Sequence, residues 1–195
     1  ANGATISNNS WGGPGFDQAL RDAIAAAGNQ EHIFVAAAGN NGTNNDIFPF
    51  YPAGYSPDNV ISVAATDHND QLASFSNYGA TTVDLAAPGV NIYSTLPTSG
   101  ALGNPSGYGS LSGTSMAAPL VAGTAALMFE ANPTLTPNLI KALLMYTAQQ
   151  LPNYNLLEQG AGELNVDGAV RLAKLVRTTI NSTTTLGASL LTGAA

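Results

Sequence analysis

The segment best suited to carry chemistry is residues 113–119, with the sequence Gly-Thr-Ser-Met-Ala-Ala-Pro. It leads into an apolar run at residues 116–129, where apolar residues occupy all sides of the predicted helix, so we expect this helix to be buried on every side. Ser115 opens the helix, where unpaired backbone N–H groups and the positive end of the helix dipole stabilise negative charge. Ser115 is therefore either a nucleophile beside an oxyanion site or an ordinary N-cap.

Two further segments follow predicted strands. Residues 33–38 form a continuous apolar run that predicts a strand buried on both faces, and Gly39 and Asn40 follow it. Sites in open α/β sheets form at the carboxyl ends of strands, and an amide placed there can donate to an oxyanion. Residues 10–13, Ser-Trp-Gly-Gly, follow another predicted strand, and their backbone could pair with an extended peptide. Each segment alone could also be a plain turn.

The residue types exclude several other chemistries. The chain has no cysteine, which excludes thiol nucleophiles, disulfides and zinc thiolate sites. Residues 113–117 lack the second glycine of an α/β-hydrolase nucleophile elbow, and no histidine follows Ser115, as that fold requires. The same segment lacks the lysine of a phosphate-binding loop. Any histidine-assisted mechanism within this chain must use His32 or His68.

Composition and charge limit the class of protein. With 195 residues, 45% of them hydrophobic, the chain can form one domain with a sizeable core. The net charge of −7 argues against a nucleic-acid partner, since phosphate binding needs a basic face. No apolar run approaches the roughly 20 residues of a membrane-spanning helix, so we expect no membrane partner.

Short apolar strands alternate with alanine-rich helices, which predicts an α/β fold with a mostly parallel sheet flanked by helices. Pro14 suits the first turn of a helix, Gly28 suits its end, and Thr136 suits an N-cap. Residues 177–195 are rich in threonine and small residues, and we interpret them as a tail or linker, with a packed strand as the alternative. The expected strands are residues 4–8, 33–38, 60–65, 83–86 and 90–94, and the expected helices are 14–27, 116–129, 136–148 and 165–176.

Taken in chain order, these segments resemble the C-terminal half of the catalytic domain of subtilisin-like serine proteases, the subtilases. The resemblance implies a subtilisin-like fold, with residues 1–176 as the C-terminal part of that domain. It also implies a serine endopeptidase that hydrolyses peptide bonds through an acyl-enzyme. Three blocks carry the resemblance, residues 8–13, 36–40 and 113–119, with smaller matches at 51–53, 74–79, 87–89 and 160–162.

The resemblance further implies roles for individual residues. Ser115 would be the nucleophile, and its own N–H and the Asn40 amide would form the oxyanion hole, with Thr114 in support. Phe50 would lie near the base of the pocket for the residue before the scissile bond and make that pocket shallow. The residues expected to bind the substrate backbone or to wall this pocket are Ser10, Trp11, Gly12, Ala37, Ala38 and Gly39.

The chain departs from the family pattern because the aspartate block and the His-Gly-Thr-His block are absent. His32 precedes the strand that leads to Asn40, so about eight residues of strand separate the two by up to ~26 Å. His68 lies in an acidic stretch, residues 67–70, that predicts a surface turn. We therefore expect both histidines to be ordinary solvent-facing or strand-edge residues. An N-terminal piece, either a separate chain after processing or a part of the protease outside this sequence, would supply the catalytic aspartate and histidine.

Two alternatives to a protease remain open at this point. The missing aspartate and histidine would also suit a non-catalytic, subtilase-like module that binds peptides. An unrelated α/β binding or structural module is the other alternative. A structure in which Asn40 does not face the start of the helix at Ser115 would support that module.

The chemistry needs no cofactor, but a structural calcium ion is a further expectation. Asp84 matches a position where some subtilases hold a weak cation site, and Asp46 and Asp58 are further oxygen donors. Solvated surface carboxylates are the alternative, because no dense ligand loop is present. The resemblance also implies an extracellular or secreted enzyme that undergoes autoprocessing, acts on protein or peptide substrates and has a propeptide as an inhibitory partner.

Overall fold

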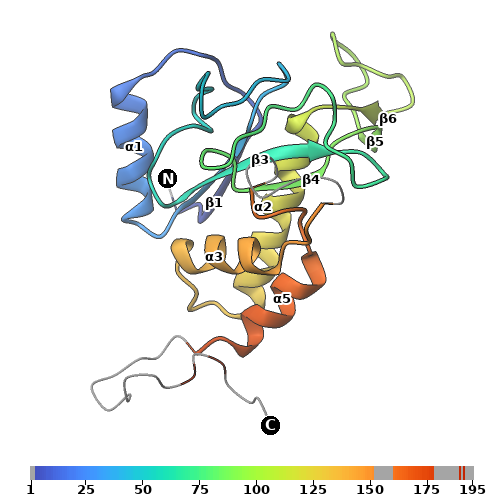
Figure 1. Cartoon of the computed structure of the whole chain (residues 1–195). Coiled ribbons are helices and arrows are strands. Elements are labelled where there is room, and N and C mark those ends of the chain that lie inside the picture. Colours follow the sequence, from blue (N-terminus) through green and yellow to red (C-terminus); the bar gives the residue numbers. More distant parts are fainter. Residues whose placement is uncertain (1–2, 152–159, 178–188, 190, 192–195) are drawn as a thin grey trace.

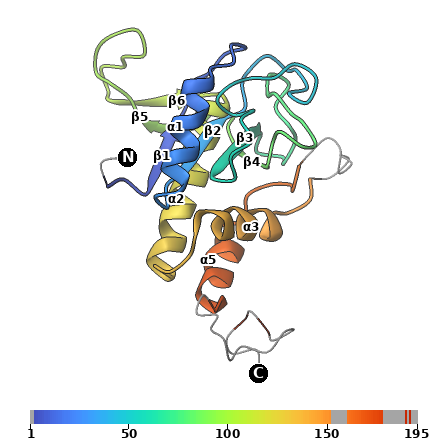
Figure 2. The same cartoon turned by 90° about the vertical axis from the view of Figure 1, so that its left-hand side faces the viewer.

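The computed structural model describes residues 3–151, 160–177, 189 and 191. At its centre is a four-stranded parallel sheet in the order β1-β2-β3-β4, and helices pack on both faces of the sheet (Figure 1, Figure 2). The expected α/β fold with a mostly parallel sheet is confirmed. The strands are β1 (Ile6–Asn9), β2 (Ile33–Ala37), β3 (Val60–Thr66) and β4 (Leu85–Pro88), and the helices are α1 (Gln18–Gly28), α2 (Thr114–Ala131), α3 (Pro137–Thr147) and α5 (Val166–Leu175).

The two central strands, β2 and β3, are buried along their whole length, as their apolar sequences predict. Because side chains alternate along a strand, Phe34 and Ala36 of β2 pack with Ile24 of α1. Ile33 and Val35 point to the other face and pack with apolar residues of α2, α3 and α5. All four strands run parallel, so their carboxyl ends lie along one edge of the sheet.

A second sheet contains two antiparallel strands, β5 (Ile92–Thr95) and β6 (Tyr108–Leu111). β5 agrees with the strand expected at residues 90–94, but the sequence does not predict β6. Glycine and serine in β6 carry little strand preference, and none of its residues is buried. The strand forms because it pairs with β5 and stacks Tyr108 on Tyr93, with ring centroids 6.1 Å apart.

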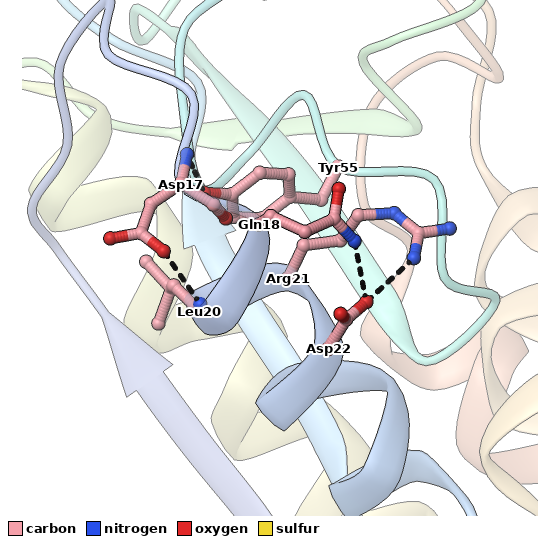
Figure 3. Close-up of polar contacts among 6 residues, drawn as sticks. All are labelled: Asp17, Gln18, Leu20, Arg21, Asp22 and Tyr55. Carbon is pink, nitrogen blue, oxygen red and sulfur yellow. Dashed lines mark hydrogen bonds and ion pairs between the residues drawn. The ribbon is translucent and has the colours of Figure 1, made fainter.

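Helix α1 begins after Asp17 and not at Pro14, so the predicted start is wrong. The Asp17 carboxylate accepts a hydrogen bond from the Leu20 N–H at 2.9 Å and caps the helix (Figure 3). Tyr55 fixes the backbone of this cap, because its hydroxyl accepts from Asp17 N at 3.1 Å and donates to Asp17 O at 2.9 Å. The helix ends at Gly28, as expected.

Helix α2 is apolar on all sides, but it is not fully buried. Val121, Ala125 and Met128 lie in the core, whereas Leu120 and Leu127 are 40% and 46% exposed. The expectation of burial on every side is therefore wrong within the part of the chain that the structure describes. Large exposed apolar side chains on one side of such a helix are typical of a surface that binds another segment or protein.

The remaining helices begin with the side-chain caps typical of their sequences. Thr136 caps α3, with Pro137 in its first turn, and the side chain of Asn165 caps α5. None of the described helices combines the length and the apolar character needed to cross a membrane.

The predicted tail or linker at residues 177–195 lies mostly outside the described residues. Within it, Leu191 forms a single antiparallel bridge with Val176, which follows α5. The division of the chain at residue 176 stays a prediction.

Candidate active site

Ser115 lies in the first turn of α2, next to the carboxyl edge of the parallel sheet. The N-cap of α2 is Gly113, which has no side chain, so the interpretation of Ser115 as an N-cap is wrong. The N–H of Gly113 donates to the carbonyl of Gly89, just after β4, at 2.8 Å. This contact holds the start of α2 against the end of the sheet, where sites in α/β folds form.

Asn40 follows β2, and its side chain meets the start of α2. Its Oδ1 accepts hydrogen bonds from both the N–H and the hydroxyl of Thr114, each at 2.9 Å. A backbone N–H can only donate, so the amide oxygen must face Thr114 and the NH2 group points elsewhere. The Thr114 hydroxyl in turn accepts from the N–H of Gly39 at 3.2 Å. Within the described residues the Asn40 NH2 group donates to no protein atom, so it is oriented and free to bind a ligand oxygen.

Ser10, which follows β1, is held against Ser115. The Ser10 hydroxyl donates to the Ser115 carbonyl at 2.9 Å. The Ser115 hydroxyl lies 3.5 Å from the Ser10 carbonyl, at the outer limit of a hydrogen bond. The structure thus brings together the ends of β1 and β2 and the start of α2, which carry the expected residues Ser10, Asn40 and Ser115.

The Ser115 hydroxyl contacts no histidine in the part of the chain that the structure describes. His32 lies at the amino end of β2, opposite to the end that carries Asn40. It is buried, with Nε2 2.9 Å from Ser7 Oγ and Nδ1 2.8 Å from the Ala4 carbonyl. This burial shows that His32 does not face solvent, and the residue lies directly before the first residue of β2. His68 is exposed in a turn, as the sequence predicts.

The remaining residues expected to bind substrate flank the ring of Phe50. Gly12 is exposed and lies beside this ring, and the preceding residue, Trp11, is also exposed. Ala37 and Ala38 lead to the other side, but their methyl groups are buried in the core, so only their backbone could contact a peptide. Phe50 thus lies near both Gly12 and Gly39, and its role at the base of a substrate pocket stays a prediction.

Asn77 is a supporting residue that sequence reasoning does not single out. Its side-chain oxygen accepts from the N–H groups of Asn41 at 2.8 Å and Thr43 at 3.3 Å. These bonds fix the loop that follows Asn40. The one available signal is that Asn77 lies within residues 74–79, a block that resembles the subtilases.

Asp84, expected as a calcium ligand, already has other partners. Its Oδ1 lies 2.9 Å from Lys141 Nζ, and its Oδ2 accepts from the N–H of Ser62 at 2.9 Å. Burial raises the pKa of Asp84, and the Lys141 ammonium offsets part of this effect. The described residues contain no cluster of three or more acidic or histidine side chains suited to a metal ion. Calcium binding stays a prediction, and the ion pair argues against Asp84 as a ligand.

The comparison with known proteins agrees with this geometry. The model of the subtilase family matches residues 1–163. The chain belongs to the subtilase family. Membership supports a serine protease function for a chain in which Asn40 contacts Thr114 at the start of α2, next to Ser115.

Curated subtilase relatives are similar over most of this chain. Subtilisin BL from Lederbergia lenta is 42% identical over 170 residues, which are 87% of this chain and 58% of that protein. Thermitase from Thermoactinomyces vulgaris is 42% identical over 175 residues, or 90% of this chain and 55% of thermitase. M-protease from Shouchella clausii is also 42% identical, but the match covers 41% of that protein. The chain thus spans about half the length of the curated relatives that it matches.

Solved subtilase structures confirm the fold. A protease from Pseudoalteromonas arctica superposes with a TM-score of 0.78 at 34% sequence identity, covering 89% of this chain and 52% of that one. A mutant of the protease domain of PatA gives a TM-score of 0.72 at 32% identity, covering 89% of this chain and 61% of that one. The expected subtilisin-like fold is therefore correct.

Proposed function

We propose that this subtilase chain carries the nucleophile and the oxyanion hole of a serine endopeptidase, whose catalytic aspartate and histidine belong to an N-terminal segment outside the chain. The observation that supports this most is the Asn40 amide. Its oxygen is bound by Thr114, and its NH2 group is free beside the first turn of α2, which carries Ser115. The NH2 group and the unpaired N–H of Ser115 are the two donors that would bind the oxygen of a scissile carbonyl.

In the proposed reaction, Ser115 Oγ attacks the carbonyl carbon of a peptide bond while the supplied histidine takes the hydroxyl proton. The electron pair of the C=O bond moves to oxygen, and the resulting oxyanion is stabilised by Asn40 and the Ser115 N–H. Collapse of this intermediate breaks the C–N bond, and the histidine gives its proton to the leaving amine. Water then attacks the acyl-enzyme in the same way, releasing the carboxylic acid and restoring the Ser115 hydroxyl.

Without the N-terminal segment, this chain would have very low activity. A serine hydroxyl is a weak nucleophile unless a base takes its proton. The Ser115 hydroxyl contacts a backbone carbonyl but no histidine among the residues that the structure describes. An oxyanion hole and a binding cleft leave only a residual rate by themselves.

The structure contains a surface suited to that segment directly beside Ser115. A groove of about 270 Å³ is lined by Ser115, Met116 and Leu120 of α2 and, among others, by Ile92 and Leu111 of the second sheet. In the described part of the chain β1 pairs with β2 alone, so its other edge is open to a further strand. An additional segment that covers this groove and pairs with β1 would bring its own residues next to the Ser115 hydroxyl.

Family membership also motivates finer parts of the proposal. We infer an extracellular enzyme that acts on proteins or peptides, is autoprocessed and has a propeptide as an inhibitory partner. A calcium ion would stabilise the fold and take no part in the reaction. Asp84 would not be its ligand, because the Asp84 carboxylate is paired with Lys141.

The direct test is labelling with a fluorophosphonate probe, which reacts with an activated serine. The complex of this chain with the N-terminal segment should be labelled at Ser115, and the chain alone should react at least ~100-fold more slowly. Ser115→Ala should abolish labelling. Ser112→Ala is a matched control, because Ser112 is an exposed serine close to Ser115, and this variant should be labelled normally. A folded complex without a Ser115 adduct would reject the proposal.

A second candidate function is a non-catalytic subtilase that binds peptides. It is favoured by the absence of a histidine contact to Ser115 among the residues that the structure describes. This candidate predicts that the complex binds peptides at residues 10–12 but forms no adduct at Ser115. The same labelling experiment, combined with a peptide titration, separates the two functions.

A further inference from the structure

The loop that carries Asn40 is exposed to solvent at this residue and at the two that follow. Asn40, Asn41 and Gly42 are all exposed, so burial does not hold this stretch of backbone in place. Thr114 binds the oxygen at the far end of the Asn40 side chain. The direction of the Asn40 NH2 group also depends on the backbone from which the side chain extends, and therefore on the groups that fix the residues before and after it.

Asn77 binds the backbone on both sides of Asn40. Its own N–H donates to the Gly39 carbonyl at 2.9 Å, and its side-chain oxygen accepts from the N–H of Asn41 at 2.8 Å. The same oxygen accepts from the N–H of Thr43 at 3.3 Å. One buried residue thus contacts the residues directly before and directly after Asn40.

Asn45 holds the side chain of Asn77 in place. The Asn77 NH2 group donates to Asn45 Oδ1, and the Asn45 NH2 group donates to the Ala38 carbonyl, each at 2.9 Å. A backbone N–H only donates and a carbonyl only accepts, so the bonds at the two ends of this pair fix the orientation of both amides. Because both side chains are buried, the pair ties the exposed loop firmly to the end of β2.

Gly39 permits the close approach of Asn77 to the loop. Its φ of 112° lies in the region that favours glycine, and a Cβ atom at this position would lie 2.5 Å from Asn77 Nδ2. The N–H of Gly39 donates to the Thr114 hydroxyl, and its carbonyl accepts from Asn77. The two groups that hold Asn40, one at its side chain and one at its backbone, therefore meet at Gly39.

We propose that Asn77, supported by Asn45, is a positioning residue for the oxyanion donor, because it fixes the backbone from which the Asn40 amide extends. The inference rests on the proposed function, since it needs Asn40 to bind the oxygen of a scissile carbonyl. Asn77 is buried and acts through Asn40, without contact to the substrate. A misplacement of about 1 Å can cost about 100-fold in rate, so a donor on a loosened loop would lose much of its effect.

The test is a double-mutant cycle in the complex with the N-terminal segment. Asn77→Ala should lower kcat about 10- to 100-fold and leave KM within about twofold. In the Asn40→Ala background the same substitution should change kcat by less than about twofold, because no donor is left to be positioned. A loss of kcat that only reflects a less stable fold would appear in both backgrounds.

Asn59→Ala is the matched control. Asn59 is also a buried asparagine, and its NH2 group donates to the carbonyls of Ile24 and His32, each at 3.0 Å. It lies directly before β3, at the amino edge of the sheet and not at the edge that carries Asn40. This variant should lower Tm, as Asn77→Ala does, but keep the wild-type kcat. An equal loss of kcat in Asn59→Ala and Asn77→Ala would overturn the proposal.

Asn45→Ser replaces Asn77→Ala in the cycle if the latter does not fold. It keeps the bonds from Asn41 and Thr43 to Asn77 and removes only their link to Ala38. It should lower kcat at least ~3-fold when Asn40 is intact and leave kcat unchanged in the Asn40→Ala background. No loss of kcat, or an equal loss in both backgrounds, would overturn the proposal.

The outcomes separate this inference from the proposed function. If the complex is labelled at Ser115 and Asn40→Ala lowers kcat, but a folded Asn77→Ala variant keeps the wild-type kcat, the proposed function stands and only the role of Asn77 is wrong. If the complex is not labelled at Ser115, or if Asn40→Ala alone leaves kcat unchanged, the proposed function fails and this inference fails with it.

Discussion

The substitution Thr114→Val tests how the oxyanion donor is oriented. Valine has nearly the shape of threonine but lacks the hydroxyl, which donates to Asn40 Oδ1 and accepts from the N–H of Gly39. Thr114 is fully buried and Gly39 is also buried, so water cannot replace the bond from the Gly39 N–H. The substitution therefore leaves the buried N–H of Gly39 unpaired and removes one of the two hydrogen bonds that orient the Asn40 amide.

The expected magnitudes follow from these two bonds. An unpaired buried N–H costs about 1–3 kcal/mol, so we expect a loss of about 2 kcal/mol in the free energy of unfolding. For a chain of this length that loss lowers Tm by roughly 4–8 °C. The Asn40 oxygen keeps its bond to the Thr114 N–H, so the amide loses one of two contacts, worth about 1 kcal/mol. In the complex with the N-terminal segment, kcat should fall about 5- to 10-fold.

Thermal unfolding of the chain and steady-state kinetics of the complex measure the two effects. Thr124→Val is the matched control on the same helix, because Thr124 is also buried but its hydroxyl donates only to the Leu120 carbonyl within α2. The control should lose less than about 1 kcal/mol and keep its kcat. If Thr114→Val has the same kcat as wild type while Tm falls, Thr114 supports the fold and not the oxyanion donor. If neither value changes, the inferred hydrogen-bond network is incorrect.

Three further predictions concern charged groups away from Ser115. Burial raises the pKa of Glu163 above 4.5, so folding favours the protonated carboxyl group relative to the unfolded chain. Glu163→Gln should therefore raise Tm at pH 8 but not below pH 4.5. The gain in Tm should grow as pH rises through the pKa of the folded state. Lys141→Met should destabilise the chain by about 3 kcal/mol in a urea titration at pH 7, because it leaves the buried Asp84 carboxylate without its cation, and adding Asp84→Asn should recover part of the loss. Burial raises the pKa of Asp46, but hydrogen bonds from Thr82 and neighbouring residues outweigh this and hold it below 3.8. The resulting stability exists above pH 3.8 and is lost as pH falls through the folded pKa, so Asp46→Asn should cost about 1 kcal/mol at neutral pH and progressively less in acid. An Asp46→Asn effect that does not vary with pH, a Glu163→Gln variant that loses stability at pH 8, or an unaffected Lys141→Met variant would each contradict its prediction.

Much of the fold is readable from local sequence. The strands β2 and β3 follow from continuous apolar runs, and α3 follows from Thr136 and Pro137 at its start. The grouping of Ser10, Asn40 and Ser115 could be expected because their sequence blocks resemble those of one family in one order.

The features that sequence reasoning missed depend on partners far away in the chain. The start of α1 depends on Tyr55, which is 38 residues away from Asp17, and the burial of His32 depends on Ser7, which is 25 residues away. The strand β6 exists because β5 pairs with it, and its own residues do not indicate a strand. Neither a periodicity nor a motif in the sequence indicates such pairings, because the partners are far apart in the chain.

The incomplete burial of α2 has a related cause. Its composition predicts a helix buried on every side, but Leu120 and Leu127 remain exposed in the described structure. Composition shows that a face requires cover, and it does not show which segment provides it. An N-terminal segment that docks beside Ser115 would resolve this difference.

The central claim is that the Asn40 amide and the Ser115 hydroxyl act on the same carbonyl group. The most direct test is the kinetics of Asn40→Ala in the complex with the N-terminal segment. Loss of this donor should lower kcat by roughly 100- to 1,000-fold, the size established for the corresponding donor in subtilisin, and leave KM within about twofold. A variant with unchanged kcat, or with a loss confined to KM, would show that Asn40 does not stabilise the transition state.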